Sequence, residues 1–463
     1  MRELSPQMFQ VDPVSIGLDG NEARELNLLL RVWSEHHGSN LRNRSYYRQE
    51  VRPKAANEAT PSQVDAMNIV LGWPTKAVDV LMARSVFAGF SGTGDGAGEL
   101  ERVTESSDLK ELYREAATSM LVGSCSFLTV SADPASGVVV SAHPAESAAA
   151  TWDMRNRRVR TGLVVVDVDD DTMQTPTWVN LYLESVTCEC RRLSSGSWEV
   201  NRLDNGIGRP LIEPLRFRPD LSRPFGRSRI SPTVRSLTDR ALETCLRTDT
   251  SAAFYTWPQR YLLNIDKKTG EQLKQKMVDA YANSIFMATY NRNGDAPVYG
   301  QLPQMSMQPH DDELQTLAKL FAGETGIPLN SLGIVFDNPS SAEAIQAGQD
   351  DLVNEATWMN RANGQAMRNV GLMALAQRRG KKVDELPADD LTICAEFEDE
   401  QHPSLSARSD FAMKVASVVP GYANTEHFWR DLGYTPEETR SVMEELREAQ
   451  VQQRLADIFG ELG

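Results

Sequence analysis

The chain has 463 residues, and its 48 Lys and Arg against 64 Asp and Glu give a formal net charge of −16. This length exceeds what one hydrophobic core usually serves, so we expect two to four domains or subdomains. The acid excess argues against a compact, basic, free-standing nucleic-acid binder, because such proteins neutralise phosphates with surplus Lys and Arg. A hydrophobic fraction of 41% is typical of a chain that folds.

Helices dominate the prediction up to about residue 122. Apolar periodicity predicts helices over 22–33, over 62–87 with a break at Gly72-Trp73-Pro74, and over 109–122. A basic and aromatic segment, 40–48, lies between the first two.

The glycines Gly92, Gly94, Gly96 and Gly98 superficially suggest a phosphate-binding loop. Such a loop needs a strand before it and Lys-Ser or Lys-Thr after it. Here a helical run is predicted before the glycines and Glu99-Leu100-Glu101 follows them, so we interpret the segment as a flexible connector.

The period changes over 124–217, where short β-branched runs alternate with turn formers such as Asp133-Pro134 and Asp204-Asn205-Gly206. This pattern predicts a β-rich module of strands and hairpins. The module contains Cys188 and Cys190, which would share one face of a strand. No second close cysteine pair completes a four-ligand zinc site, and five cysteines in all do not favour a disulfide scaffold, so a reducing compartment fits better.

Two helices are predicted to bracket a small mixed insert. Ser231 is a natural N-cap and Pro232 fits the first helical position, so a helix should run from there to Pro258. The insert covers 259–309, and a short helix follows over 311–323 with acidic residues at its start.

The longest predicted helix starts at Ser340, which forms a capping box with Glu343, and it stops at Gly380. Its forty or so residues would span roughly 60 Å, which is long for an enzyme core and ordinary for a structural ring component. An acidic stretch over 384–400 should separate this helix from a last helical module, in which Thr435 and Pro436 cap the final helix.

Residues for catalysis or metal binding are not gathered in any recognisable pattern. The six histidines lack the spacing of a helical zinc site, and no nucleophile elbow or Cys–His arrangement appears. His310 with Asp311 and Asp312 could bind a divalent cation, although a helix N-cap is the simpler interpretation. The pair Asp389-Asp390 lies in a charged run and is expected on the solvated surface. The sequence thus predicts no enzyme, no catalytic or metal-binding residue and no cofactor.

Basic residues cluster twice despite the acidic total: Arg155, Arg157, Arg158 and Arg160 flank a strand, and Arg216, Arg218, Arg223, Arg227 and Arg229 precede the helix at 231. We expect ion pairing within or between subunits for both clusters rather than nucleic-acid binding, because no aromatic residues alternate with the arginines.

Several stretches resemble one known family. They are Leu221-Ser222-Arg223-Pro224-Phe225-Gly226-Arg227-Ser228-Arg229-Ile230-Ser231, then Trp257-Pro258-Gln259-Arg260-Tyr261, then Asp337-Asn338-Pro339-Ser340-Ser341-Ala342-Glu343-Ala344-Ile345, and finally Asp431-Leu432-Gly433-Tyr434-Thr435-Pro436-Glu437-Glu438. In this order they resemble the portal proteins of long-tailed bacteriophages, in the branch common among phages of actinobacteria. The resemblance covers most of the chain, and the Pro-Ser-Ser-Ala-Glu-Ala stretch is its most specific part.

The resemblance implies an α+β portal-protein fold with a β-rich wing, a two-helix stem, a small mixed clip, a long wing helix and a helical crown. The parts would be 1–229 for the wing, with a helical N-terminal part and β-rich 124–217, then 230–258 for the first stem helix and 259–309 for the clip. The second stem helix and a connector would occupy 310–333, the tunnel loop and long wing helix 334–399, and the crown 400–463.

The resemblance also implies site residues. The tunnel loop at the constriction of the DNA channel would be Val335, Phe336, Asp337, Asn338, Pro339, Ser340 and Ser341. The clip would contact terminase and adaptor through Lys267, Lys268, Lys274, Lys276, Asn291 and Arg292.

The function implied is that of a portal ring subunit at the unique capsid vertex, forming the channel for DNA packaging and ejection. Expected partners are further copies of the chain in a ring, usually of twelve, the terminase large subunit, the head–tail adaptor, the major capsid protein and scaffold, and double-stranded DNA in passage. The expected location is the virion, after assembly in the host cytoplasm. No membrane is expected among the partners, because the sequence shows no run of 18 apolar residues and no signal-like pattern at its start. The acid excess suits a channel wall, since phosphates should not stick to it.

Two rival hypotheses remain. A nucleotide-dependent packaging motor should carry a Walker loop, and the glycine-rich stretch fails that test. Another structural or maturation protein of the phage head would not be expected to show the order of stem, clip and stem.

Overall fold

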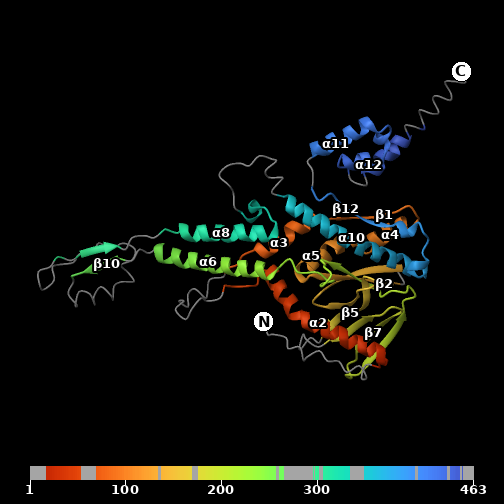
Figure 1. Cartoon of the computed structure of the whole chain (residues 1–463), viewed down its shortest axis with the longest axis horizontal. Coiled ribbons are helices and arrows are strands. Elements are labelled where there is room, and N and C mark those ends of the chain that lie inside the picture. Colours follow the sequence, from red (N-terminus) through yellow and green to blue (C-terminus); the bar gives the residue numbers. More distant parts are fainter. Residues whose placement is uncertain are drawn as a thin grey trace, which may run out of the picture. The chain divides into compact units, whose positions relative to one another are not determined.

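The computed structural model describes residues 17–53, 69–133, 137–168, 176–256, 260–264, 296, 298–301, 306–333, 349–401, 405–434, 438–448 and 451. The chain divides into two compact units, Met1–Glu396 and Phe397–Gly463. Helices and antiparallel strands share the first unit, which confirms the mixed helix and sheet class predicted from the sequence (Figure 1).

The first unit contains a five-stranded antiparallel sheet, in the order β4 (Ala148–Asp153), β5 (Arg158–Val168), β6 (Pro176–Tyr182), β7 (Val186–Arg192) and β8 (Trp198–Asp204). Helix α2 (Gly20–Tyr47) packs on this sheet. Its apolar residues Leu26, Leu29, Leu30 and Trp33 form one core with strand residues that include Leu163, Leu181, Cys188 and Cys190. The two cysteines therefore share the buried face, as their spacing predicted, and all five cysteines are free thiols.

Helix α2 is longer than its apolar pattern predicted. It begins at a capping box, in which the carboxylate of Asp19 accepts the backbone N–H of Glu22 while the carboxylate of Glu22 accepts that of Asp19. The basic and aromatic segment after residue 40 forms its last turns and not a link between helices. Asn40 and Asn43 are buried there because their amides donate to the carbonyls of Ala145 and Val122.

A second, three-stranded antiparallel sheet has the order β3 (Gly137–Pro144), β2 (Cys125–Asp133) and β9 (Ile212–Arg216). Helices α5 (Leu109–Gly123) and α10 (Asp350–Arg379) pack on it. The two sheets meet closely, since a Cβ at Gly162 of β5 would lie 2.5 Å from Cγ2 of Ile212 in β9. The β-rich module predicted over 124–217 is thus confirmed as two antiparallel sheets.

The glycine-rich segment is not a flexible connector. Strand β1 (Phe87–Ser91) precedes it, where a helix was predicted, and helix α4 (Gly96–Ser106) starts inside it. Strand β1 pairs with β12 (Cys394–Phe397), far along the chain, and this pairing explains why the helical pattern does not continue through Phe87. Glu99, near the start of α4, forms ion pairs with Arg378 and Arg379, so these arginines are engaged by a carboxylate of the chain itself.

The acidic stretch predicted over 384–400 contains the boundary between the two units, as expected, but its first part is packed against the first unit. Asp390 has only 3% of its surface exposed, although a solvated position was predicted. Its carboxylate accepts the backbone N–H of Gly96 and pairs with Arg379, and these partners make its burial tolerable. The backbone carbonyls of Leu391 and Ile393 accept bonds from Arg368 of α10. This first part therefore packs along α4 and α10.

Helix α10 ends where the sequence predicted, at Gly380, whose φ of +60° suits a glycine C-cap. Its start differs, because α10 begins at Asp350 and not at Ser340. The proposed capping box of Ser340 and Glu343 lies outside the described residues.

The second unit is a small helical module. It contains α11 (Leu405–Val418) and α12 (Glu426–Asp431), and Thr425 caps α12 by accepting the backbone N–H of Phe428. Rings of Tyr422, Phe428, Trp429 and Tyr434 pack edge-on against one another in sequence. The helical character predicted for the end of the chain is confirmed in the described residues.

Candidate functional site

The most distinctive feature of the first unit is an arm built from α6 (Pro232–Thr256), α8 (Gln308–Thr325) and the ribbon of β10 (Arg260–Leu263) with β11 (Val298–Gln301). Helices α6 and α8 lie side by side, with the ribbon beyond their far ends (Figure 1). The 25 residues of α6 correspond to about 37 Å of helix. The order of helix, insert and helix predicted from the sequence is thus present.

The hydroxyl of Ser231 makes two hydrogen bonds at the base of the arm. The Ser231 hydroxyl accepts the backbone N–H of Val234 at 3.1 Å, which confirms Ser231 as the N-terminal cap of α6. The same hydroxyl donates to the carboxylate of Glu324 at 3.1 Å, near the end of α8. One serine therefore starts the outgoing helix and fixes the returning helix beside it.

The interactions that join the two helices of the arm change from its base to its outer turns. Near the base its helices bury apolar side chains, and Trp73 of α3 (Trp73–Met82) lies against Phe321 with ring centroids 5.3 Å apart. These buried residues include Val234, Leu237, Ala241, Leu242, Leu317, Ala318, Phe321 and Ala322. Farther out, Leu246 is also buried, and polar contacts join the two helices.

Two polar contacts join the outer turns of the arm. Arg247 of α6 pairs with Glu313 of α8 at 3.2 Å, and the Ser251 hydroxyl lies 3.2 Å from Nε2 of His310. His310 belongs to the first turn of α8 and is not its N-cap, because the helix begins earlier, at Gln308.

The base of the arm is joined to the rest of the unit by Arg229. Its guanidinium donates to the carbonyls of Ala77 in α3 at 2.6 Å and Thr325 at the end of α8 at 2.7 Å, and it pairs with Glu355 in α10. Burial lowers the pKa of Arg229, and the Glu355 carboxylate opposes that shift. One side chain thus connects α3, α8 and α10 directly before α6 begins.

Ion pairing within the chain, expected for the two arginine clusters, is confirmed for five of their members. Arg158 pairs with Glu184, Arg160 with Glu25, Arg227 with Asp220, and both Arg218 and Arg229 with Glu355. Arg216 instead lies over the ring of Trp152, 4.5 Å from its centroid.

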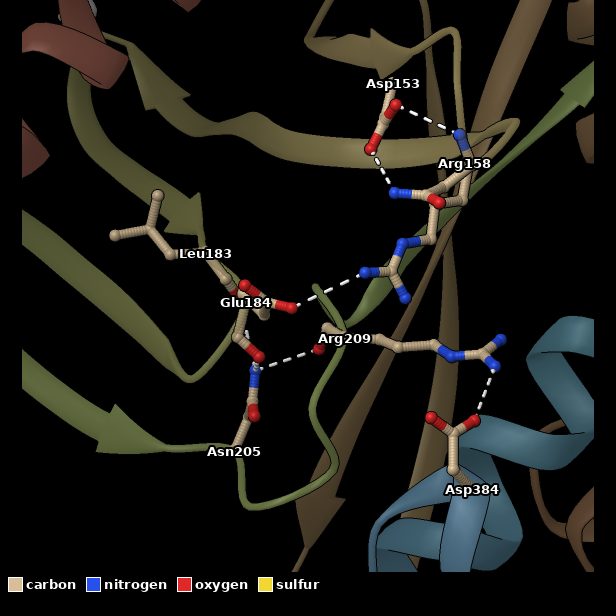
Figure 2. Close-up of polar contacts among 8 residues, drawn as sticks. Asp153, Arg158, Leu183, Glu184, Asn205, Arg209 and Asp384 are labelled. Atoms are coloured by element: carbon tan, nitrogen blue, oxygen red, sulfur yellow. Dashed lines mark hydrogen bonds and ion pairs between the residues drawn. The ribbon is translucent and has the colours of Figure 1, made fainter.

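Polar contacts also join the five-stranded sheet to the segment after α10 (Figure 2). Arg158 reaches Glu184 at 3.5 Å, and the Asn205 amide donates to the carbonyls of Glu184 and Arg209. Arg209 then pairs with Asp384 at 3.3 Å. These contacts hold the link between β8 and β9 against the turn that follows α10.

The residues that the resemblance assigned to binding lie outside the described part of the chain. This applies to the seven tunnel-loop residues, Val335 to Ser341, and to the six clip residues, Lys267, Lys268, Lys274, Lys276, Asn291 and Arg292. Their roles stay predictions. Strands β10 and β11 fall within the segment 259–309 that was predicted as the clip, and the segment predicted as the tunnel loop follows α8 and precedes α10 in the chain.

Sequence reasoning missed the Arg229–Glu355 pair and the burial of Asp390. Each buried charge has a partner more than ten residues away, at positions 355, 379 and 96, and no local spacing signals such contacts. The only available hint was the position of Arg229 directly before an N-cap.

Among the described residues, no three His, Cys, Asp or Glu side chains lie close enough together to hold a metal ion. Within the same part of the chain, no helix is long and apolar enough to cross a bilayer.

Comparisons with known proteins give one consistent result. No protein-family model matches the chain. The portal protein of Mycobacterium phage D29 is 29% identical over 421 residues, which are 87% of this chain and 84% of that protein. The portal protein of Mycobacterium phage L5 is 29% identical over 415 residues, which are 86% of this chain and 82% of that protein.

Among solved structures, the neck of a native gene transfer agent particle, computed with C12 symmetry, aligns with a TM-score of 0.44 at 12% identity, covering 80% of this chain and 89% of that one. A chain from the virion of a native gene transfer agent particle aligns with a TM-score of 0.42 at 13% identity, covering 79% of this chain and 90% of that one. The resemblance seen in the sequence is confirmed by the curated relatives, and the chain is a homologue of the portal proteins of mycobacterial phages.

Proposed function

We propose that this chain is one subunit of a portal ring at the unique vertex of a phage head. The observation that carries the proposal is the similarity, over 87% of the chain, to a protein named as a portal protein. The two-helix arm supports it, because an antiparallel helix pair with a small insert at its far end is what a portal stem and clip require. The role is structural, and DNA enters and leaves the head through the ring.

In this proposal helices α6 and α8 are the two helices of the stem, and 259–309, which includes β10 and β11, is the clip that terminase and the head–tail adaptor contact. Residues 1–229 with α10 form the wing, 334–349 contain the tunnel loop, and 400–463 form the crown. Twelve subunits make the ring, and the major capsid protein and scaffold surround it. Assembly takes place in the host cytoplasm.

Charge along the arm suggests which helix faces DNA. Helix α8 carries four acidic side chains, Asp311, Asp312, Glu313 and Glu324, against one lysine, Lys319. Helix α6 is balanced, with three acidic residues and three arginines. Because a wall that attracts phosphates would slow DNA, we assign α8 to the channel side of the ring.

The experiment is to purify the full chain and measure its mass by light scattering, together with negative-stain imaging. Twelve copies of 51.4 kDa give a ring of about 0.6 MDa with a central hole. A chain that remains a monomer or compact dimer under all conditions contradicts the proposal. For the tunnel loop, deleting residues 335–341 should leave rings intact but reduce the DNA packaged or retained per head.

A further inference from the structure

Glu355 carries one negative charge and is shared by two arginines. Arg229 is buried, with 3% of its side chain exposed, and needs this carboxylate because an unpaired buried cation is costly. Arg218 lies 2.5 Å from the other carboxylate oxygen, and 62% of its side chain is exposed. Arg229, Glu355 and Arg218 together have a net charge of +1. Because Arg218 is the exposed member, this excess positive charge faces the solvent.

The loop that follows Arg218 has a fixed shape. The Asp220 carboxylate accepts the backbone N–H groups of Ser222 and Arg223, at 2.8 and 2.9 Å, and pairs with Arg227 at 2.6 Å. The Ser222 hydroxyl, which donates to the same carboxylate at 2.6 Å, lowers the pKa of Asp220 most, followed by Arg227 and the two backbone N–H groups. Gly226 has φ +79°, and a Cβ there would lie 2.1 Å from the carbonyl oxygen of Phe217, so only glycine fits.

This fixed loop presents an apolar side chain to solvent. Leu221 at its tip is 82% exposed. The neighbouring Arg223 is also exposed, and among the described residues no acidic side chain pairs with it. A fixed loop loses little conformational entropy when a partner binds it.

Helix α10 also exposes one apolar residue and one arginine close to Glu355, namely Trp358 and Arg361. Trp358, one turn farther along, is 68% exposed, and residues three apart on a helix are neighbours. The guanidinium of Arg361 lies over the Trp358 ring, 5.2 Å from its centroid. No acidic partner of Arg361 occurs in the described part of the chain.

We propose that these residues form a contact surface for an acidic face of a second copy of this chain, the adjacent subunit of the ring. This arm-root surface consists of Arg218, Leu221, Arg223, Trp358 and Arg361. The inference rests on the proposed ring, and it names the surface through which neighbouring subunits join.

Charge complementarity indicates that the partner of the arm-root surface is another copy of this chain. The surface carries three arginines, and the two acids described beside them are already engaged: Glu355 is shared by Arg229 and Arg218, and Asp220 pairs with Arg227. The chain as a whole has a net charge of −16, so another copy offers the acids that this surface lacks. A contact between different faces of identical subunits is the kind that closes a ring. Arginine and tryptophan are also the residues that most often dominate the binding energy of interfaces.

The test compares the concentration at which rings of the full chain fall apart into subunits, measured by mass photometry over a dilution series. The variants are Trp358→Ala and the double variant Arg223→Gln/Arg361→Gln. The matched control is Trp178→Ala/Arg191→Gln, since Arg191 lies over Trp178 at 4.9 Å in the five-stranded sheet, outside the proposed surface. We expect each variant to raise the dissociation midpoint by about tenfold or more, with the control unchanged.

Each other outcome has a definite meaning. Rings that form equally well in all variants overturn the arm-root surface while leaving the proposed function intact. A wild-type chain that never forms rings overturns both. A variant that lowers the thermal unfolding midpoint of the subunit without changing assembly shows that the chain itself covers the surface, and this also overturns the inference.

Discussion

Arg229 and Glu355 form an ion pair in which both side chains are nearly excluded from water, with 3% and 9% of their surfaces exposed. In every other ion pair among the described residues, at least one partner is more than 20% exposed. Because Arg229 also holds the end of α8, the pair fixes the arm relative to α10. The attachment of the arm therefore depends on a charge that has no access to solvent.

Replacing Glu355 by Gln should destabilise the first unit by about 3–5 kcal/mol, because a buried guanidinium loses its counter-charge. Thermal unfolding of the full chain, at matched oligomeric state, measures the effect. Arg209→Gln is the control: its partner Asp384 is 86% exposed, so loss of that pair should cost about 1 kcal/mol or less. Equal shifts for the two variants would contradict the role given to Arg229.

Two glycines in α4 should respond in opposite directions to replacement by alanine. A Cβ at Gly96 would lie 2.4 Å from Oδ1 of Asp390 and 3.0 Å from Cδ1 of Leu375, so Gly96→Ala should cost about 1–3 kcal/mol. A Cβ at Gly98 meets nothing within 4 Å, and alanine there should stabilise the helix by up to about 1 kcal/mol. The thermal midpoints of both variants decide this, and a neutral Gly96→Ala would show that the segment around Asp390 is loosely packed.

Glu213 should make stability fall as pH rises. Burial raises the pKa of Glu213 to about 7, against the opposing effects of its bond from Asn369 and of Arg216 and Arg209. The native state therefore holds a proton that the unfolded chain releases above about pH 4.5, and stability is lost between about pH 4.5 and 7. A shift of this size corresponds to about 3 kcal/mol.

The check is Glu213→Gln, which keeps the shape and removes the charge. The variant should match the wild type near pH 4 and unfold at a higher temperature at pH 8. Glu199→Gln, at an exposed position of β8, should have no such pH-dependent effect. An unchanged pH profile in Glu213→Gln would exclude Glu213 as the source of the trend.

If α8 faces the channel, reversing its charges should hinder DNA. Asp311→Lys/Asp312→Lys is expected to lower the DNA packaged per head, measured by nuclease-protected DNA after complementation of a phage lacking its portal gene. Glu243→Lys/Asp249→Lys makes the same change on α6 and is the matched control. A stronger packaging defect in the α6 variant than in the α8 variant would assign α6 to the channel instead.

Local signals predicted the arm well. Ser231-Pro232 marks the start of α6 and Gly380 marks the end of α10, because caps depend on residues within one turn. The glycine-rich segment and Asp390 were predicted wrongly, because their structure depends on each other across almost 300 residues. The predicted binding residues of the clip and tunnel loop came from family resemblance, and they stay predictions because they lie outside the described structure.

The pairing of β1 with β12 has a consequence for how the protein is made. Strand β1 ends at Ser91, whereas its partner ends at Phe397, so about 300 residues must be synthesised between them. At ribosomal rates of about 5–20 residues per second, β1 waits roughly 15–60 s for its partner. During that time its edge is open to pairing with other chains. Correct assembly therefore favours chains that are completed before they meet, and premature termination before Cys394 should yield a product prone to aggregation.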